Sequence, residues 1–207
     1  LFPYTTLFRS ISIAGDLGSG KTTVTKLMQR DLGYEIYRNG TYFRKLAVEH
    51  GMSVTEFNVY VTEHPEIDRQ IEQSATEYAV DHDEFIIDAR LGWYSVPESF
   101  KVYLTVDIDE AARRAFNDPD RKESESFATL EEQKADIQRR FELENKRYFE
   151  LYGVHKEDLS NYDFVLDTTH ILPEEVNKRI LEAYQKWLSN AIAQKGQPFS
   201  CENQERR

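Results

Sequence analysis

Short apolar, β-branched runs alternate along this chain with longer segments whose apolar residues recur at helical spacing. The pattern predicts strands at 11–14, 34–38, 84–90, 100–107 and 162–169. It predicts helices at 20–33, 41–51, 53–64, 65–82, 109–116, about 129–152 and from Pro173 onward. Ser53 is the expected N-cap of one helix, and Gly33 is expected to close another. Because strands and helices alternate, we expect one α/β domain with a five-stranded parallel sheet and helices on both faces.

The two ends of the chain and one internal segment depart from this pattern. Residues 1–10 translate the codons of a synthetic adapter of the kind ligated to DNA before sequencing, so we expect an assembly artefact there. A natural terminal strand is the alternative. The polar segment 117–128 is expected to be a mobile loop, and the tail 195–207 is expected to be disordered. The domain itself is then expected to span 11–194.

The composition narrows the functional classes. The formal net charge is −11, which disfavours duplex DNA or RNA as a partner, because nonspecific affinity comes from many Lys and Arg side chains on phosphates. No apolar run approaches the ~18 residues of a membrane span. The only cysteine, Cys201, lies in the polar tail, so disulfides are not expected and a reducing, cytoplasmic setting fits. We expect a monomer that acts on small molecules.

The segment GDLGSGKT at 15–22 follows the first strand and opens the first helix, which is the context of a P-loop. In such a loop the glycines let backbone N–H groups turn toward phosphate oxygens, and Lys21 reaches the terminal phosphates. We expect ATP as the phosphate donor, with Mg²⁺ held by the Thr22 hydroxyl. A merely tight Gly-rich turn is the alternative. The expected ATP-binding residues here are Gly15, Asp16, Leu17, Gly18, Ser19, Gly20, Lys21, Thr22 and Thr23.

The residues after the P-loop distinguish a kinase from a switch or a motor. A compact helical insertion follows the second strand directly, as in small-molecule kinases. The segments YRNGTYFR, DARLGWY, DEAARRAF and RRFELENKRYFELYG resemble the nucleoside monophosphate kinases, most closely the compact archaeal-type cytidylate kinases. The resemblance covers nearly all of 11–185. It implies a P-loop kinase fold with acceptor-binding helices at 39–82, a short lid at 117–128, and ATP-dependent phosphorylation of CMP or dCMP.

The same resemblance implies a set of acceptor-binding residues. Gly40 would lie near the acceptor, and Arg44 would contact its phosphate. Asp88 and Arg90 end an apolar strand at the carboxyl edge of the sheet, where such folds bind ligands. By resemblance Arg90 grips the acceptor phosphate, while Asp88 orients the acceptor or water molecules on Mg²⁺. From the residues alone, Arg44 could be a solvated helix residue and Asp88 a cap.

Two residues of this region depart from the family pattern, and a third departs from the pattern of the bacterial enzymes. Arg38 and Asn39 precede the glycine of the acceptor-binding helices, where the family usually has a small residue or Ser. Bacterial cytidylate kinases carry an acid directly after the arginine that matches Arg90. Here Leu91 follows Arg90, as in the archaeal-type relatives. The cytosine-reading contact of the bacterial enzymes is therefore not transferred to this chain.

The long helix at about 129–152 presents Arg140, Glu144 and Arg147 on one polar face at i, i+4 and i+7. A second face carries Ile137, Phe141, Tyr148 and Tyr152. An exposed salt-bridge ladder would explain the polar face. The family resemblance instead implies that the two arginines contact phosphate or ribose and that Glu144 accepts a hydrogen bond from a ribose hydroxyl.

Three arginines flank the polar segment and are expected to close over the ATP phosphates as a lid: Arg113, Arg114 and Arg121. The expected catalytic residues are Lys21, Arg90, Arg140 and Arg147. The leading hypothesis is a kinase that phosphorylates CMP or dCMP by in-line transfer without a covalent enzyme intermediate. Two alternatives stay open. One is a kinase for another small phosphate or hydroxyl acceptor, and the other is a P-loop ATP-binding regulatory module without turnover.

Overall fold

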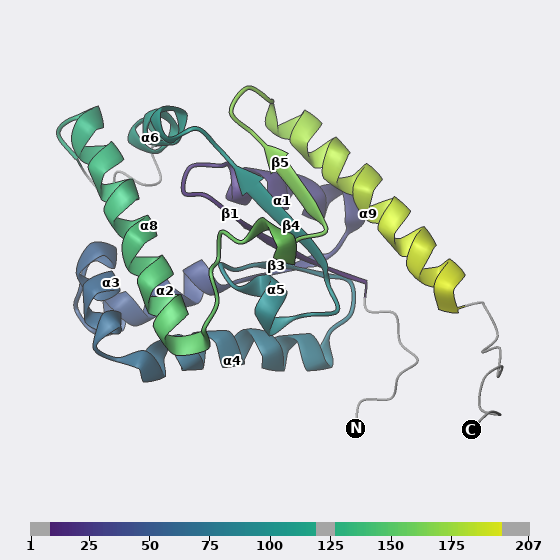
Figure 1. Ribbon diagram of the computed structural model, residues 1–207, viewed down its shortest axis with the longest axis horizontal. Helices are drawn as coiled ribbons and strands as arrows, with labels where there is room; N and C mark the ends of the chain where they lie inside the picture. The colour runs from purple at the N-terminus through teal and green to yellow at the C-terminus, as the bar shows by residue number, and fades with distance from the viewer. Residues whose placement is uncertain (1–8, 119–126, 196–207) are drawn as a thin grey trace, which may run out of the picture.

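The computed structural model describes residues 9–118 and 127–195, and its centre is a five-stranded sheet in which neighbouring strands run parallel (Figure 1). The strands are β1 (Ser10–Gly15), β2 (Glu35–Arg38), β3 (Phe85–Asp88), β4 (Phe100–Thr105) and β5 (Phe164–Asp167). Their spatial order is β2-β3-β1-β4-β5. From the central strand β1, the chain first adds β2 and β3 on one side of the sheet and then adds β4 and β5 on the other side. At such a change of direction, the carboxyl ends of the neighbouring strands, here β1, β3 and β4, border the crevice where these sheets bind ligands.

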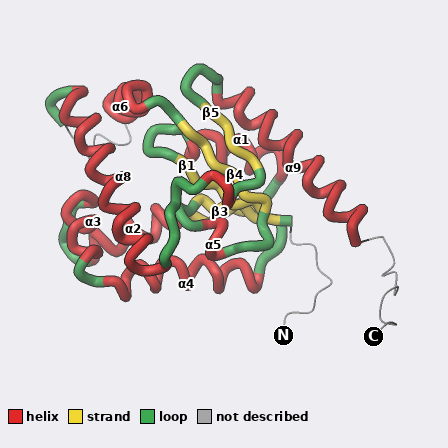
Figure 2. The backbone as a smooth tube through the Cα atoms, viewed as in Figure 1, coloured by secondary structure: helices red, strands yellow, loops and turns green. Residues whose placement is uncertain are grey.

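Helices cover both faces of this sheet (Figure 2). The helices are α1 (Lys21–Leu32), α2 (Asn39–Glu49), α3 (Val54–Thr62), α4 (Pro65–Asp81), α5 (Gly92–Ser95), α6 (Ile108–Asn117), α8 (Leu130–Tyr152), α9 (Pro173–Lys195) and the 3₁₀ turn η1 (Leu159–Asn161). On one face, α1 and α9 bury Met28 and Tyr184 against the strands. On the other face, α4 and α5 cover Phe85 and Ile87. The predicted five-stranded parallel α/β fold is confirmed.

The insertion between β2 and β3 forms a small core of its own. Helices α2, α3 and α4 pack around Leu46, Phe57 and Val61. Helix α8 contacts α3 of this insertion and packs along α6, where Leu17 and Ile137 meet. Figure 1 shows α8 running past α2 and α3 toward α6. One side of α8 therefore faces the insertion and the carboxyl edge of the sheet instead of solvent.

Local signals set most helix ends where the sequence predicts them. Ser53 caps α3 by accepting from the backbone N–H of Glu56, whose side chain accepts in return. Thr129 caps α8 in the same way with Glu132. The residue predicted as the approximate start of this helix is therefore its N-cap. Gly33 ends α1 in the left-handed conformation.

Three histidines end the three helices of the insertion in one repeated way. His50, His64 and His82 each donate from Nδ1 to the backbone carbonyl four residues earlier, at 2.8 Å in every case. Each bond gives a carbonyl in the last turn of α2, α3 or α4 a side-chain donor, and the carbonyls of Leu46 and Tyr60 also accept a backbone N–H. These histidines are therefore packing and capping residues.

The first strand begins at Ser10, which pairs in register with Phe85. Arg9 donates its backbone N–H to Asp83 at 2.7 Å and forms an ion pair with Glu84 at 2.7 Å. Residues 1–8, 119–126 and 196–207 lie outside the described residues, so the interpretations of these segments stay predictions. At the edges of the three predicted segments, Ser10, Asn117 and Lys195 belong to β1, α6 and α9. Within 9–118 and 127–195, no helix is both long and apolar enough to cross a membrane.

Candidate active site

The P-loop joins β1 to α1 at the carboxyl edge of the sheet. Gly15 has a φ of +148°, and a Cβ there would lie 2.3 Å from the carbonyl oxygen of Leu104, so a side chain does not fit. Gly18 has a φ of +81°, and a Cβ there would lie 2.8 Å from the Cα of Ala111. The loop is thus pressed between β4 and α6. This packing leads the backbone into the N-terminus of α1, which attracts anions.

Lys21 folds back over this loop. Its Nζ donates to the carbonyl oxygens of Gly15 at 2.6 Å and Asp16 at 2.8 Å. Burial, together with the nearby Arg90 guanidinium, lowers the pKa of the Lys21 ammonium to about 7. An anion placed beside Lys21 would reverse this effect. The site therefore favours a negatively charged ligand at this position.

The charges around Lys21 come from segments far apart in the sequence. Asp88 at the end of β3 and Glu144 in the middle of α8 both raise the pKa of Lys21, against the lowering by Arg90. These three residues and Lys21 were predicted as site residues from separate segments. The fold brings them together at one edge of the sheet.

Two P-loop residues hold the loop in place. Asp16 accepts hydrogen bonds from the Tyr103 hydroxyl at 2.8 Å and from the backbone N–H of Val106 at 3.1 Å. Leu17 is buried against α6 and α8. Both side chains therefore position the phosphate-binding backbone by anchoring it to its neighbours.

The remaining P-loop side chains lie at the start of α1. The backbone carbonyl of Ser19 accepts from the Thr168 hydroxyl at 3.0 Å, which connects the loop to the end of β5. The Ser19 hydroxyl is buried and makes no hydrogen bond within the described part of the chain. Thr22 and Thr23 are exposed on the first turn of α1.

The oxygen groups at this edge suit Mg²⁺ bound through a nucleotide. Among residues 9–118 and 127–195, no three His, Cys, Asp or Glu side chains are grouped to hold a metal. Mg²⁺ is usually held by one or two protein oxygens together with substrate phosphates and water. The Thr22 hydroxyl and the Asp88 carboxylate match that donor set.

Arg38, which departs from the family pattern, lies beside Asp88. Strands β2 and β3 place the two residues in register, with Arg38 Nε 3.9 Å from Asp88 Oδ2. Arg38 Nη2 also donates to the Thr25 hydroxyl of α1 at 3.4 Å. The chain therefore adds a cation between the β3 edge and the helix that follows the P-loop.

A buried carboxylate lies between two cations next to the P-loop. Arg90 Nε donates to Glu144 Oε2 at 3.0 Å, and Lys156 Nζ lies 2.5 Å from the same oxygen. Burial opposes ionisation of Glu144, but Arg90 and Lys156 outweigh it and hold the pKa of this carboxyl below its ordinary value. Lys156 was not predicted as a site residue, because a lone lysine in a polar loop carries no sequence signal.

The polar face of α8 is buried. Arg140 is 9% exposed, and Glu144 and Arg147 are each 5% exposed. The alternative of an exposed salt-bridge ladder is therefore wrong. Arg140 approaches the Asp136 carboxylate at 4.0 Å. Burying three charged side chains is costly unless they are paired, so this face is built around polar partners.

Two carboxylates of α4 connect the insertion to this face. Asp68 forms an ion pair with Arg147, with 2.6 Å between Oδ2 and Nε. Glu72 accepts from the Ser95 hydroxyl at 2.5 Å and from Asn39 Nδ2 at 3.3 Å. Burial raises the pKa of Asp68 to about 6 and that of Glu72 to about 7. Sequence analysis missed both acids, because their partners lie on other elements.

The predicted acceptor residues of α2 lie nearer to solvent. Gly40 and Arg44 are both exposed, and Arg44 Nη2 donates to the Thr41 hydroxyl at 3.5 Å. A Cβ on Gly40 would lie 3.7 Å from Arg44 Nη1, so the guanidinium lies over the glycine. An acceptor contact by Arg44 stays a prediction.

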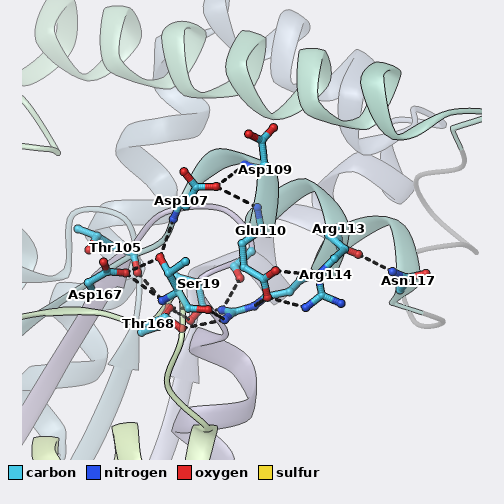
Figure 3. Close-up of polar contacts among 12 residues, drawn as sticks. Ser19, Thr105, Asp107, Asp109, Glu110, Arg113, Arg114, Asn117, Asp167 and Thr168 are labelled. Atoms are coloured by element: carbon cyan, nitrogen blue, oxygen red, sulfur yellow. Dashed lines mark hydrogen bonds and ion pairs between the residues drawn. The ribbon is translucent and has the colours of Figure 1, made fainter.

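Arg114 braces the P-loop against the loop that follows β5 (Figure 3). Its Nη1 donates to the Gly18 carbonyl and the Thr168 hydroxyl, each at 3.4 Å, and its Nη2 donates to the carbonyls of Thr168 at 2.7 Å and Thr169 at 3.1 Å. Its Nε donates to Glu110 at 2.7 Å. These five bonds occupy the five N–H donors of a guanidinium. In this arrangement Arg114 holds the loop, and the predicted phosphate contact would require it to release partners.

The other two predicted lid arginines are placed differently. Arg113 is exposed and pairs with Glu110 at 2.6 Å, and Arg121 lies outside the described residues. Beside this pair is a cavity of about 630 Å³ at the start of α6. The cavity is lined by Asp107, Asp109, Glu110, Arg113, Leu130, Asp167, Thr169 and His170.

Comparisons with known proteins agree with the fold and with a kinase family. Residues 11–144 match the AAA domain family. The cytidylate kinase of Thermoplasma volcanium is 37% identical over 176 residues, which cover 83% of this chain and 88% of that protein. The cytidylate kinase of Thermoplasma acidophilum is 35% identical over 170 residues, covering 80% of this chain and 87% of that one. A gluconokinase structure from Sinorhizobium meliloti 1021 has a TM-score of 0.58 at 13% identity, covering 91% of this chain and 98% of that one, and shares the fold.

Proposed function

The chain belongs to the cytidylate kinase family of P-loop phosphotransferases, and we propose that it transfers the γ-phosphoryl group of ATP to CMP or dCMP. The observation that carries the proposal is the convergence of Lys21, Arg90 and Glu144 at the carboxyl edge of the sheet. Lys21 of the P-loop thus lies near the Arg90 guanidinium, which suits a second phosphate, and near the Glu144 carboxylate, which suits the ribose of that nucleotide. This arrangement supports a nucleoside monophosphate as the acceptor.

The donor side is built from the P-loop. ATP phosphates would take the place of the Gly15 and Asp16 carbonyls as partners of Lys21 Nζ, and their negative charge would raise its lowered pKa. The Thr22 hydroxyl and Asp88 would hold Mg²⁺ and its water molecules. When bound, Mg²⁺ neutralises charge on the transferring phosphates.

The cavity beside α6 suits the adenosine part of ATP. Its carboxylates, among them Asp107 and Asp167, accept hydrogen bonds from hydroxyl or amino groups and repel phosphates. It lies next to the Arg114 brace, which reaches the P-loop at Gly18. Arg113, which lines the same cavity, would then lie beside the bound nucleotide.

The acceptor side is built from β3, α2 and α8. Arg90, Arg140 and Arg147 would bind the acceptor phosphate, with Gly40 and Arg44 at its outer edge. Glu144 would accept from a ribose hydroxyl. These guanidinium groups would hold the acceptor oxygen in line with the γ-phosphorus and stabilise the charge of the transferred group.

The transfer needs no protein base. A phosphate monoester has its second pKa near ~6, so an acceptor oxygen is already ionised at neutral pH. That oxygen forms a bond to the γ-phosphorus while the bond to the β,γ-bridging oxygen breaks, and ADP leaves with that electron pair. Closure of the insertion would exclude water, which otherwise competes as the acceptor.

A coupled assay of ADP release with Mg-ATP tests this function on AMP, CMP, GMP, UMP and dCMP. We expect the highest kcat/KM for CMP and dCMP. A higher kcat/KM for another acceptor would identify that acceptor as the substrate, and the transfer chemistry at the P-loop would be unchanged. Absence of turnover in a folded protein that binds ATP would favour the regulatory module. The Lys21→Ala variant is the control for contaminating kinases.

A further inference from the structure

We propose that Lys156 is a positioning residue of the acceptor site, which shares the Glu144 carboxylate with Arg90 and thereby keeps the Arg90 guanidinium available to an anionic acceptor. The inference rests on the proposed function, in which Arg90 binds the acceptor phosphate. Lys156 itself would touch neither ATP nor the acceptor.

The surroundings of Lys156 support an indirect role. Its side chain is 6% exposed, and its Nζ lies 2.5 Å from Glu144 Oε2, the oxygen that also accepts from Arg90. The ammonium lies 4.6 Å from the centre of the Phe141 ring, at the distance of a cation–π contact. Its charge is thus enclosed by α8. A group held in this way acts through the carboxylate that it contacts.

The loop that carries Lys156 is also connected to the P-loop. The Lys156 backbone carbonyl accepts from the Tyr162 hydroxyl at 2.9 Å. The Tyr162 ring packs on Tyr103 with 4.8 Å between ring centres, and the Tyr103 hydroxyl donates to Asp16 at 2.8 Å. Since each of these contacts is at least partly buried, the lysine has a defined place relative to the phosphate-binding loop.

The charges of this cluster explain why sharing matters. Arg90 and Lys156 are two cations on one carboxylate, so the group keeps a net charge of +1 that favours an added anion. If Lys156 were neutral, the pair of Glu144 and Arg90 would carry no net charge. A guanidinium pairs best with a carboxylate through two parallel hydrogen bonds, so Arg90 would turn more of its donors toward Glu144. The acceptor phosphate would then lose both charge and donors.

Steady-state kinetics of Lys156→Met tests this reasoning, because methionine has a similar length and no charge. We expect the KM for CMP to rise about tenfold, the size of one charge-assisted contact, while the KM for ATP stays at the wild-type value and kcat changes less. Lys156→Arg should recover most of the affinity because it restores the charge. Lys146→Met is the matched control, since Lys146 is exposed on α8 and pairs only with Glu150 among its described contacts.

A second background separates sharing from general packing. In Glu144→Gln there is no carboxylate to share, so adding Lys156→Met should change the KM for CMP by less than twofold. A tenfold effect in both backgrounds would overturn the proposal. So would an unchanged KM for CMP with a lowered Tm, or an equal rise in the KM values for CMP and ATP, because either outcome indicates a purely structural lysine.

The proposed function and this inference fail in distinguishable ways. Wild-type enzyme that phosphorylates no nucleoside monophosphate overturns both. Wild-type enzyme that turns over CMP while Lys156→Met keeps the same KM overturns the inference alone. Should Lys156→Met not fold, Lys156→Gln provides the same comparison, because it keeps a hydrogen-bond donor and removes the charge.

Discussion

Glu72 provides a test of the buried polar network through stability instead of turnover. Its carboxyl group accepts from Ser95 and Asn39 and lies between α4, α5 and the start of α2. Burial and, to a smaller extent, Asp68 raise its pKa, the two hydrogen bonds and Arg147 oppose the rise, and the resulting pKa is about 7. In the folded protein this side chain therefore keeps its proton at a pH where an unfolded chain would lose it.

The sign and size of the effect follow from that difference. In the unfolded chain Glu72 ionises near its ordinary pKa of 4.5, and in the folded protein near about 7. Between these values the native state binds one more proton than the unfolded state, so the free energy of unfolding falls as the pH rises. The contribution is complete below pH 4.5 and lost above about pH 7. At about 1.4 kcal/mol for each pH unit, the loss is about 3 kcal/mol.

The perturbation is Glu72→Gln, which cannot ionise and keeps the shape and the acceptor for Asn39. We expect wild type to lose about 3 kcal/mol relative to this variant between pH 4.5 and pH 8. For a chain of this size the Tm of the variant should gain roughly 6 to 12 °C on wild type over that range. Urea unfolding and differential scanning calorimetry at several pH values measure both quantities.

Taking the difference between the two proteins removes the titration of shared groups that do not interact with Glu72. Glu77→Gln is the matched control, because Glu77 is an exposed glutamate on the same helix, and its difference from wild type should not vary with pH in this way. A wild-type-minus-variant difference that is flat between pH 4.5 and pH 8, or that grows in favour of wild type, would refute the reasoning. Either result would mean that Glu72 is ionised when folded.

Three further variants test the site. Lys21→Ala should abolish turnover while circular dichroism and Tm stay near wild type, and a folded variant with normal kcat would exclude the P-loop role. Arg147→Ala should lower kcat/KM by roughly 10²-fold to 10⁴-fold and, because it leaves Asp68 buried without its partner, lower the unfolding free energy by about 3 kcal/mol. Adding Asp68→Asn should recover stability but not kcat/KM; recovery of both would assign Arg147 to folding alone. Arg114→Ala should raise the KM for ATP about tenfold and leave the KM for CMP unchanged, because it releases Gly18 from the loop after β5. Arg114→Lys should restore little of the ATP affinity. Equal effects on the KM values of both substrates would contradict this role.

The sequence by itself determined the fold class and the donor half of the site, because both depend on short-range patterns. Short apolar, β-branched runs and helical spacing separate strands from helices, and the order of elements then indicates a parallel sheet covered on both faces. The P-loop is a contiguous segment whose glycines, Lys21 and Thr22 take their positions from local backbone geometry. The ends of α3 and α8 follow from Ser53 and Thr129 for the same reason.

The acceptor half depended on tertiary structure. Helical spacing places Arg140, Glu144 and Arg147 on one face, but the same spacing serves a solvated face and a buried one. Only the packing of α8 against α6 and the insertion decides that this face is buried. Adjacency to the lid segment likewise suggested a phosphate contact for Arg114, whereas the fold gives its donors other partners.

Lys156 and the acids of α4 show why the sequence could not identify the rest. Asp68 lies 79 residues from Arg147, and Glu72 lies 33 residues from Asn39 and 23 from Ser95. Neither Asp68 nor Glu72 stands in a motif. What makes them matter is desolvation together with a particular partner, and both arise only when separate elements pack together. The sequence shows which residues carry a charge, but the free energy of each charge depends on its surroundings in the folded protein.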